Sequence, residues 1–446
     1  MIIIKNGRIL NPATGLDEVA DLIVEGERVK EIGKNIAENY KKNDADSCGN
    51  NDKNDDETII IDAKGLNVMP GIVDLHVHFR DPGQTYKETL ATGAKAAVRG
   101  GVTTVCPMPN TKPAVDNPEL VKELVQRAKD ETDINLLFIG AATKGQIGNE
   151  TTDVKGMKRE GIVAISEDGK SVMNSLECRK AMKAAKEEDI VVMAHCEDIN
   201  LVDGGTMNAG KKAEELGQRG ITNAVEDIIA VRDMLLSKET GARLHLCHVS
   251  TEDSVKMLKI AKEDGIEVTA ECCPHHFTLC DEDIPCNDAN YKMNPPLRSR
   301  KDMEALRKGL KEGVLDCIST DHAPHSAEEK SGGFENSPFG IVGLETSLAL
   351  SYTTLVKGGY LTPLELAEKM SYNPAKVIKF DRGNIDVGKI ADITVYDPEE
   401  KFVINTDEFA SMGRNTPFNG KEVYGKVKYT ICGGKILYKS GGNYND

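Results

Sequence analysis

The sequence predicts an α/β protein with a (β/α)8 TIM barrel and a small β-sandwich domain formed by both chain ends. Three observations support this fold class. Between residues 69 and 375, short apolar segments alternate with amphipathic segments of helical period, which is typical of a parallel barrel. On both sides of this region the chain carries short β-rich runs with Gly and Asn between them. The length of 446 residues fits one large barrel plus one smaller domain.

The N-terminal part of the predicted sandwich spans residues 1–68. Its β-rich runs at 2–4, 21–24 and 58–61 suit a small antiparallel unit. Residues 41–57 are polar throughout and have no apolar periodicity, so we interpret them as a solvated insertion. A calcium loop is the alternative for this acidic segment, but the DxDxDG register and the closing Glu are missing.

The barrel prediction covers residues 69–375 and contains eight strands and at least six helices. Apolar runs such as residues 190–194 fit strands that are buried on both faces. The expected strands are 71–79, 102–109, 134–142, 162–167, 190–196, 242–249, 266–272 and 316–319. The expected helices are 118–129, 176–188, 224–236, 251–264, 301–309 and 341–355. The C-terminal part of the sandwich follows in residues 376–446, with β-rich runs at 391–397, 401–404 and 424–438.

Composition excludes several classes of function. Lys and Arg number 56 against 72 Asp and Glu, and a net charge of −16 argues against nucleic acid as a partner. No run of about 18 apolar residues occurs, so no membrane span is predicted. The N-terminus lacks a secretory signal and the 11 cysteines are scattered, which indicates reduced thiols and a cytoplasmic location. Cys272, Cys273, Cys280 and Cys286 lack paired CxxC spacing and are interpreted as buried or free thiols.

The histidines concentrate in the predicted barrel, since all nine lie between His76 and His325. On the first strand, His76, His78 and Arg80 alternate, so we expect them on one face at the strand's C-terminal end. Two imidazoles two residues apart suit a divalent metal, whereas the alternative is a pair of hydrogen-bonded interior histidines. An arginine beside a cation site indicates that an anion lies between them.

Further candidate ligands follow other strands of the barrel. They are Glu167 and Asp168 after strand 4, His195 after strand 5, His245 or His248 on strand 6, and Asp321 after strand 8. Alternation does not decide between His245 and His248, because they are three residues apart. Together these residues form the ligand set of two divalent cations bridged by a carboxylate and a hydroxide. His275 and His276 follow strand 7 without an assigned role.

Eight segments resemble the bacterial class I dihydroorotase family within the amidohydrolase superfamily. They are DLHVHFRDPG (74–83), MPNT (108–111), SEDG (166–169), AHCE (194–197), CHVST (247–251), MNPPLR (293–298), STDHAPHSAEEK (319–330) and PFGIVGLET (338–346). The resemblance covers nearly the whole chain in order, including the flanking β segments. The sequence departs from the family pattern at Glu167, where Asp is expected, and at Ser319, where Gly or Ala is usual. Residues 41–57 are extra.

The resemblance implies roles for individual residues, and it selects His248 over His245 and Asp168 over Glu167. The implied metal ligands are His76, His78, Asp168, His195, His248 and Asp321. The implied substrate contacts are His78, Arg80, Asn110, Asn294, His325 and the backbone of Phe339 and Gly340. Asp321 is the implied catalytic residue that transfers the proton.

The implied activity is the reversible cyclisation of N-carbamoyl-L-aspartate to L-dihydroorotate in de novo pyrimidine (UMP) biosynthesis. A metal-bound hydroxide with Asp321 as general acid/base is the implied mechanism. The implied cofactor is Zn²⁺, two ions per subunit, although the N/O ligand set also suits manganese or cobalt. The implied partners are this small-molecule substrate and a second copy in a homodimer, with neither nucleic acid nor membrane.

Two alternative functions stay open at this point. Another cyclic amidase, of the hydantoinase or allantoinase type, needs the same metals but not Arg80, Asn110 and His325 together for an acidic group. A non-catalytic partner of a transcarbamoylase is expected to have lost ligands, and here the full set is present.

Overall fold

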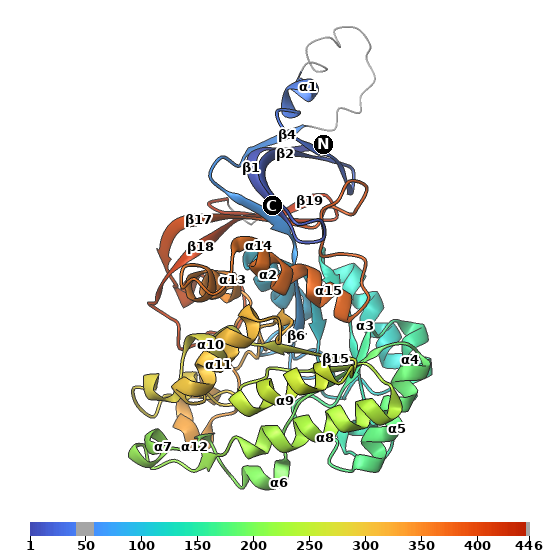
Figure 1. Ribbon diagram of the computed structural model, residues 1–446, viewed down its shortest axis with the longest axis vertical. Helices are drawn as coiled ribbons and strands as arrows, with labels where there is room; N and C mark the ends of the chain where they lie inside the picture. The colour runs from blue at the N-terminus through green and yellow to red at the C-terminus, as the bar shows by residue number, and fades with distance from the viewer. Residues whose placement is uncertain (42–57, 443–446) are drawn as a thin grey trace.

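The computed structural model describes residues 1–41 and 58–442, which form a barrel and a sheet of the two chain ends (Figure 1). The sheet lies at one side of the barrel, together with the N-terminus and helix α1 (Ala37–Lys41). It includes the C-terminal strands β17 (Ile393–Val403), β18 (Glu422–Cys432) and β19 (Lys435–Lys439). Most of the expected insertion, residues 42–57, lies outside the described residues. In the part of the chain that is described, no helix is both long and apolar enough to cross a membrane.

The barrel strands agree with the eight that the sequence predicts. They are β6 (Ile72–Val77), β7 (Val102–Pro107), β8 (Asn135–Leu136) continued by β9 (Ile139–Ala141), β10 (Ala164–Ser166), β11 (Val191–Ala194), β14 (Leu244–Leu246), β15 (Val268–Cys272) and β16 (Cys317–Ile318). Every pairing among them is parallel, which requires a crossover after each strand. The first and last positions meet where Val77 pairs with His322 and the His78 N–H donates to the His322 carbonyl at 2.8 Å.

Helices cover the outside of the barrel between the strands. They are α2 (Leu90–Arg99), α3 (Pro118–Glu131), α4 (Val154–Glu160), α5 (Ser175–Glu187), α8 (Ala224–Thr240), α9 (Glu252–Glu263), α11 (Arg300–Lys311) and α13 (Ser347–Ser351). Local signals fix where several begin. Asn117 accepts from the Leu120 N–H ahead of Pro118 in α3, and Thr251 accepts from the Ser254 N–H in α9.

Smaller elements interrupt this pattern. Between β11 and α8 lie α6 (Ile199–Val202), β12 (Met207–Asn208), α7 (Lys211–Glu215) and β13 (Gly220–Ile221). The segment α10 (Pro274–Thr278) follows β15, α12 (Gly333–Asn336) precedes α13, and α14 (Pro363–Ala367) and α15 (Asn373–Val377) lead back to the sheet.

One predicted helix begins later than expected. The sequence predicts a helix over 341–355, but α13 begins at Ser347 and continues as a π-helical turn over Tyr352–Val356. Ile341 instead pairs with His322, and its carbonyl accepts from the Ala323 N–H at 2.8 Å. Ile341, at the apolar start of this segment, therefore forms a β-bridge next to the last barrel strand and is not part of the helix.

The chain ends form one eight-stranded sheet in the order β19-β18-β17-β5-β1-β2-β3, with β4 also paired to β1. Its strands are β1 (Ile2–Asn11), β2 (Leu16–Glu25), β3 (Arg28–Gly33), β4 (Ile59–Asp62), β5 (Asn67–Pro70), β17 (Ile393–Val403), β18 (Glu422–Cys432) and β19 (Lys435–Lys439). They enclose an apolar core that includes Ile4, Leu22, Val68 and Ile393. The expectation of a small antiparallel N-terminal unit is confirmed for β1, β2 and β3 and is wrong for β4 and β5. These two strands run parallel to β1, because the connection after β3 is long enough to cross over.

Candidate metal centre and active site

His76 and His78 leave the end of β6 and face two carboxylates. His76 Nε2 lies 3.2 Å from Asp168 Oδ1 and 3.5 Å from Asp321 Oδ1. His78 Nε2 lies 3.3 Å from Asp168 Oδ2 and 3.0 Å from Asp321 Oδ1. β6 ends at Val77, two residues earlier than predicted, and Arg80 has a φ of +55°. Arg80 therefore reaches the same cavity through a left-handed backbone, not through strand alternation.

His195 and His248 complete the cluster around Asp168. His195 Nδ1 and His248 Nε2 lie 3.5 and 3.4 Å from Asp168 Oδ1, and 2.8 Å from each other. His245 lies deeper in the barrel, where its Nδ1 is 2.8 Å from Thr269 Oγ1. The structure thus places His248, and not His245, beside the other candidate ligands.

Of the two neighbouring acids after β10, only Asp168 faces the histidines. Glu167 accepts hydrogen bonds from the backbone N–H of Thr143 at 3.0 Å and from its hydroxyl. Asp168 lies among the four imidazoles, with Oδ1 towards His76, His195 and His248 and Oδ2 towards His78. This is the arrangement in which one carboxylate can bridge two cations.

The donors fit a pair of divalent cations. Nitrogen-to-oxygen distances of 3.0–3.5 Å match the roughly 3.4 Å edge of a tetrahedron of ligands about 2.1 Å from its centre. Within residues 1–41 and 58–442, His76 Nε2 and Asp168 Oδ1 are fully buried and have no hydrogen-bond partner. Buried polar atoms rarely stay unpaired, so these two atoms point to a cation between them.

The electrostatics of the cluster keep its acids ionised. Burial, the largest influence, raises the pKa of Asp168, but the imidazoles of His76, His195 and His248 hold that pKa well below its usual value. The pKa of Asp321 is also lowered, because His78 and its neighbours outweigh burial. Burial lowers the pKa of His195, but Asp168 and Glu197 raise it to about 10. Ionised carboxylates among imidazoles are the donors that Zn²⁺ prefers.

Glu271 on β15 is a residue that sequence reasoning missed. It is fully buried inside the barrel and lies 2.9 Å from His76 Nδ1 through Oε1 and 3.2 Å from His245 Nε2 through Oε2. Because a carboxylate only accepts, His76 donates from Nδ1 and directs the lone pair of Nε2 towards Asp168 and Asp321. A glutamate within the buried run 268–272 was the available signal.

A cavity of about 210 Å³ opens beside this cluster. It is lined by the predicted site residues His78, Arg80, Asn110, Asp168, His195, His248, Asn294, Asp321, Phe339 and Gly340. Two predicted residues lie behind this lining. His76 is fully buried, and His325 lies with its Nε2 3.2 Å from Nη2 of Arg80. Asn110 Oδ1 lies 2.8 Å from His78 Nδ1, so Asn110 also orients a candidate ligand.

Two lysines that sequence reasoning missed shape the substrate side of the cavity. Lys87 Nζ donates to His325 Nδ1 at 3.2 Å, and His325 Nε2 donates to the Phe339 carbonyl at 2.9 Å. Burial and the neighbouring cations Arg80, Lys87 and Lys330 lower the pKa of His325 to about 3, so this imidazole stays neutral. Lys330 ends the segment 319–330, but neither lysine has a spacing that signals these contacts, and Lys87 reaches His325 across 238 residues.

Lys330 holds the segment that carries Phe339 and Gly340. Its Nζ donates to the carbonyls of Lys292, Pro338 and Gly340 at 2.9–3.2 Å. Gly340 has a φ of +127°, and a Cβ there would lie 2.7 Å from Cβ of Ala323. The backbone at this point can therefore approach the cavity only with glycine.

Comparison with known proteins places these features in context. The amidohydrolase family model matches residues 67–437. A dihydroorotase of Clostridioides difficile is 45% identical over 440 residues, covering 99% of this chain and 100% of that protein. A dihydroorotase of Geobacter metallireducens is 44% identical over 438 residues, covering 98% and 99%. An L-hydantoinase (dihydropyrimidinase) structure from Arthrobacter aurescens has a TM-score of 0.85 at 26% identity, covering 99% of this chain and 96% of that one.

Proposed function

The chain belongs to the amidohydrolase family and is a hydrolase of cyclic amides, and we propose that it works as a dihydroorotase. The reaction is the reversible cyclisation of N-carbamoyl-L-aspartate to L-dihydroorotate in pyrimidine biosynthesis. The observation that carries this proposal is Arg80, a half-buried cation that lines the same cavity as Asp168 and Asp321. A cation at this position suits a cyclic amide that bears a carboxylate.

Two zinc ions per subunit are the cofactors that we propose. His76, His78, Asp168, His195, His248 and Asp321 would hold them. When bound, such ions polarise a ring carbonyl and lower the pKa of water to about 7. The two buried unpaired atoms, His76 Nε2 and Asp168 Oδ1, support this assignment.

The other side chains around the cavity bind and position the substrate. Arg80 and Asn110 bind the substrate carboxylate, with the guanidinium offering two parallel N–H groups. Asn294 and the backbone of Phe339 and Gly340 surround the ring, and His325 braces the Arg80 side of the cavity.

Asp321 carries the proton in both directions of the reaction. In ring opening its carboxylate takes a proton from the attacking water and delivers it to the leaving ring nitrogen. Its Oδ1 lies 3.0 Å from His78 Nε2, at the point where the barrel closes and its first and last strands meet. In ring closure the same carboxyl group must start protonated.

A hydantoinase-type specificity is less well supported. The hydantoinase structures match the fold at 26% identity or less, whereas the dihydroorotases match at 42–45% over nearly the full chain. The homodimer that the family resemblance implies stays a prediction, which sedimentation of the purified protein would test.

The proposal is tested by following both directions of the reaction with purified protein. We expect L-dihydroorotate and N-carbamoyl-L-aspartate to reach the same final ratio from either side, and a chelator to abolish both rates. Asp321→Asn should slow both directions by roughly a hundred- to ten-thousand-fold. A protein that turns over neither compound after reloading with zinc, manganese or cobalt would contradict the proposal.

A further inference from the structure

Glu197 connects a candidate metal ligand to a candidate substrate contact. It follows β11 and is buried, with 9% of its surface exposed. Its Oε2 lies 3.0 Å from His195 Nε2, and its Oε1 accepts from Asn294 Nδ2 at 2.9 Å. Its backbone is held by Ser171, whose hydroxyl accepts from the Glu197 N–H at 3.1 Å and donates to the His195 carbonyl at 2.6 Å.

The contact with His195 fixes one tautomer of the imidazole. An ionised carboxylate can only accept, so the hydrogen of His195 must be on Nε2. Nδ1 is then the nitrogen that faces the cluster, 3.5 Å from Asp168 Oδ1, and a bound cation would take the place of a proton on this atom. A hydrogen bond at the far nitrogen is the usual device that orients a metal-binding histidine.

The contact with Asn294 fixes the orientation of its amide by the same reasoning. The NH2 group must face Glu197, which leaves Oδ1 as the hydrogen-bond acceptor that Asn294 can offer to the cavity it lines. The next residue is anchored as well, because His276 Nε2 donates to the Pro295 carbonyl at 2.8 Å. An acceptor at this position favours a ligand that presents a ring N–H and disfavours one that presents a carbonyl.

We propose that Glu197 is a positioning residue that sets the His195 tautomer and the Asn294 amide orientation together. The inference rests on the proposed function for the identity of the ligand, a cyclic amide with a ring N–H. The Glu197 side chain thus determines both which nitrogen of His195 faces the metal centre and which atom of the Asn294 amide faces the substrate.

Two substitutions separate the two contacts. In Glu197→Gln the amide oxygen can still accept from His195, so its NH2 faces Asn294 and forces that amide to turn. We expect KM for L-dihydroorotate to rise roughly 10- to 100-fold with metal retention close to wild type. Glu197→Ala removes both contacts, so metal loss to a chelator should also become roughly 10- to 100-fold easier.

A double-mutant cycle with Asn294→Ala tests whether Glu197→Gln changes KM through the Asn294 amide. Once Asn294 is removed, Glu197→Gln should raise KM no further, because its effect on substrate acts through that amide.

Glu226→Gln is the matched control. Glu226 is similarly buried and accepts from the backbone of Ser250 at 3.0 Å, and none of its hydrogen-bond or ion-pair partners is a proposed site residue. It should lower stability while KM and metal retention stay at wild-type values.

The inference is overturned by a wild-type KM in Glu197→Gln, by KM effects that multiply in the double mutant, or by wild-type metal retention in Glu197→Ala. Metal retention is measured from the bound metal that remains after timed chelation, which does not depend on turnover. Failure of the proposed function looks different, because wild-type protein itself would then leave L-dihydroorotate intact.

Discussion

Arg80 is the residue that most directly sets the charge of the accepted ligand. Burial, the largest influence, lowers its pKa, and the nearby Asp321 and Asp168 carboxylates oppose that shift. The guanidinium contacts the Pro324 carbonyl at 3.3 Å through Nε and His325 at 3.2 Å through Nη2. These contacts in the described structure are with neutral groups at 3.2–3.3 Å, so an anionic ligand can replace them.

Arg80→Met should keep the fold and the bound metal but lose affinity for the carboxylate substrate. Two hydrogen bonds to a charged group contribute roughly 1.5–3 kcal/mol each, so KM for L-dihydroorotate should rise by roughly two orders of magnitude or more. Steady-state kinetics with metal analysis of the same sample checks this. Unchanged KM and kcat would show that Arg80 does not contact the substrate.

Asp168 and Glu167 offer a matched pair of substitutions at adjacent positions. Asp168→Asn removes the charge between four imidazoles, so the purified variant should contain little metal and have little activity. Glu167→Gln changes an acid that contacts Thr143 and should retain wild-type metal content. Elemental analysis decides: equal metal loss in both variants would contradict the assignment of Asp168 as the bridging carboxylate.

The residues that the sequence could predict are those next to strand ends in a regular pattern. His76, His78 and Asp321 were found because barrel strands place their final residues at one mouth. Glu271, Lys87 and Glu197 were not found, because their partners come from other strands and loops and no spacing reports such contacts. The choice of His248 over His245 needed the family resemblance, since His248 leaves the strand with a φ of +35°.

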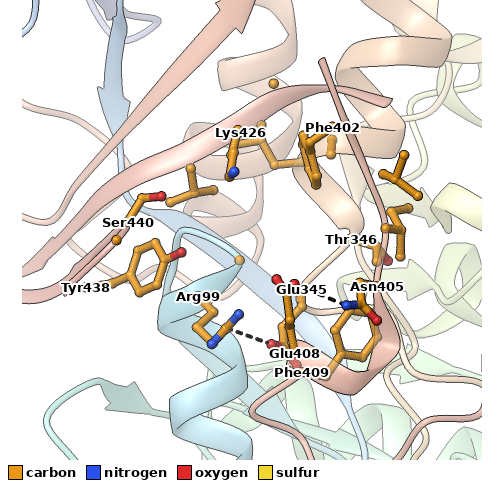
Figure 2. A pocket seen from close by; sticks show the side chains of 18 of the residues that line it. Arg99, Glu345, Thr346, Phe402, Asn405, Glu408, Phe409, Lys426, Tyr438 and Ser440 are labelled. Carbon is orange, nitrogen blue, oxygen red and sulfur yellow. Dashed lines mark hydrogen bonds and ion pairs between the residues drawn. The ribbon is translucent and has the colours of Figure 1, made fainter. Parts of the chain in front are cut away.

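At the scale of elements, the junction between barrel and sheet encloses a second cavity, of about 430 Å³ (Figure 2). It lies among α2, α13 and strands β17 and β18, away from the metal centre. Figure 2 shows Arg99 of α2 facing Glu345, with Arg99 Nε 3.1 Å from Oε1 of Glu345. Glu345 also accepts from the N–H groups of Ala410 at 2.8 Å and Ser411 at 3.1 Å. This carboxyl group therefore joins α2, the start of α13 and the connection between β17 and β18.

Glu345 should make the stability of this junction depend on pH. Burial raises the pKa of its carboxyl to about 7, although the backbone donors and Arg99 lower it. The unfolded chain has the ordinary value of 4.5, so between pH 4.5 and 7 the folded protein binds more protons. The contribution of Glu345 to the free energy of unfolding is therefore greatest below pH 4.5. It falls by about 3 kcal/mol as the pH rises to 7, at roughly 1.4 kcal/mol per pKa unit.

Glu345→Gln removes this titration. We expect the free energy of unfolding of the variant, relative to wild type, to improve as pH rises from 5 to 7.5, whatever its offset at low pH. Denaturant unfolding at several pH values measures the difference. Parallel curves for the two proteins would show that Glu345 has no raised pKa in the folded state.

Among the elements, long periodic segments were predicted well and short or irregular ones were not. The eight barrel strands and helices such as α3 and α9 agree with the sequence prediction within a few residues. The insertion from α6 to β13 was missed, because its elements have two to five residues and are too short to show a period. The parallel pairing of β4 and β5 with β1 depends on a crossover that local sequence does not specify.

At the scale of the whole molecule, an acidic protein places a cation in the wall of one cavity. The net charge is −16, yet Arg80 lines the cavity at the mouth of the barrel, and Lys87 lies behind it in an ion pair with Glu329. A local field of this kind can bind an anionic substrate against the overall charge. The cysteines that the structure describes are all free, as expected for reduced thiols in a chain stabilised by its core.

The central claim is that this site hydrolyses a cyclic amide that carries a carboxylate. The most direct test compares kcat/KM for L-dihydroorotate with kcat/KM for dihydrouracil, the same ring without the carboxylate, on one zinc-loaded preparation. We expect a preference for L-dihydroorotate of roughly a hundred- to ten-thousand-fold, because the charge-assisted contacts of Arg80 act on that substrate alone. Equal turnover of the two rings, or a preference for dihydrouracil, would contradict it.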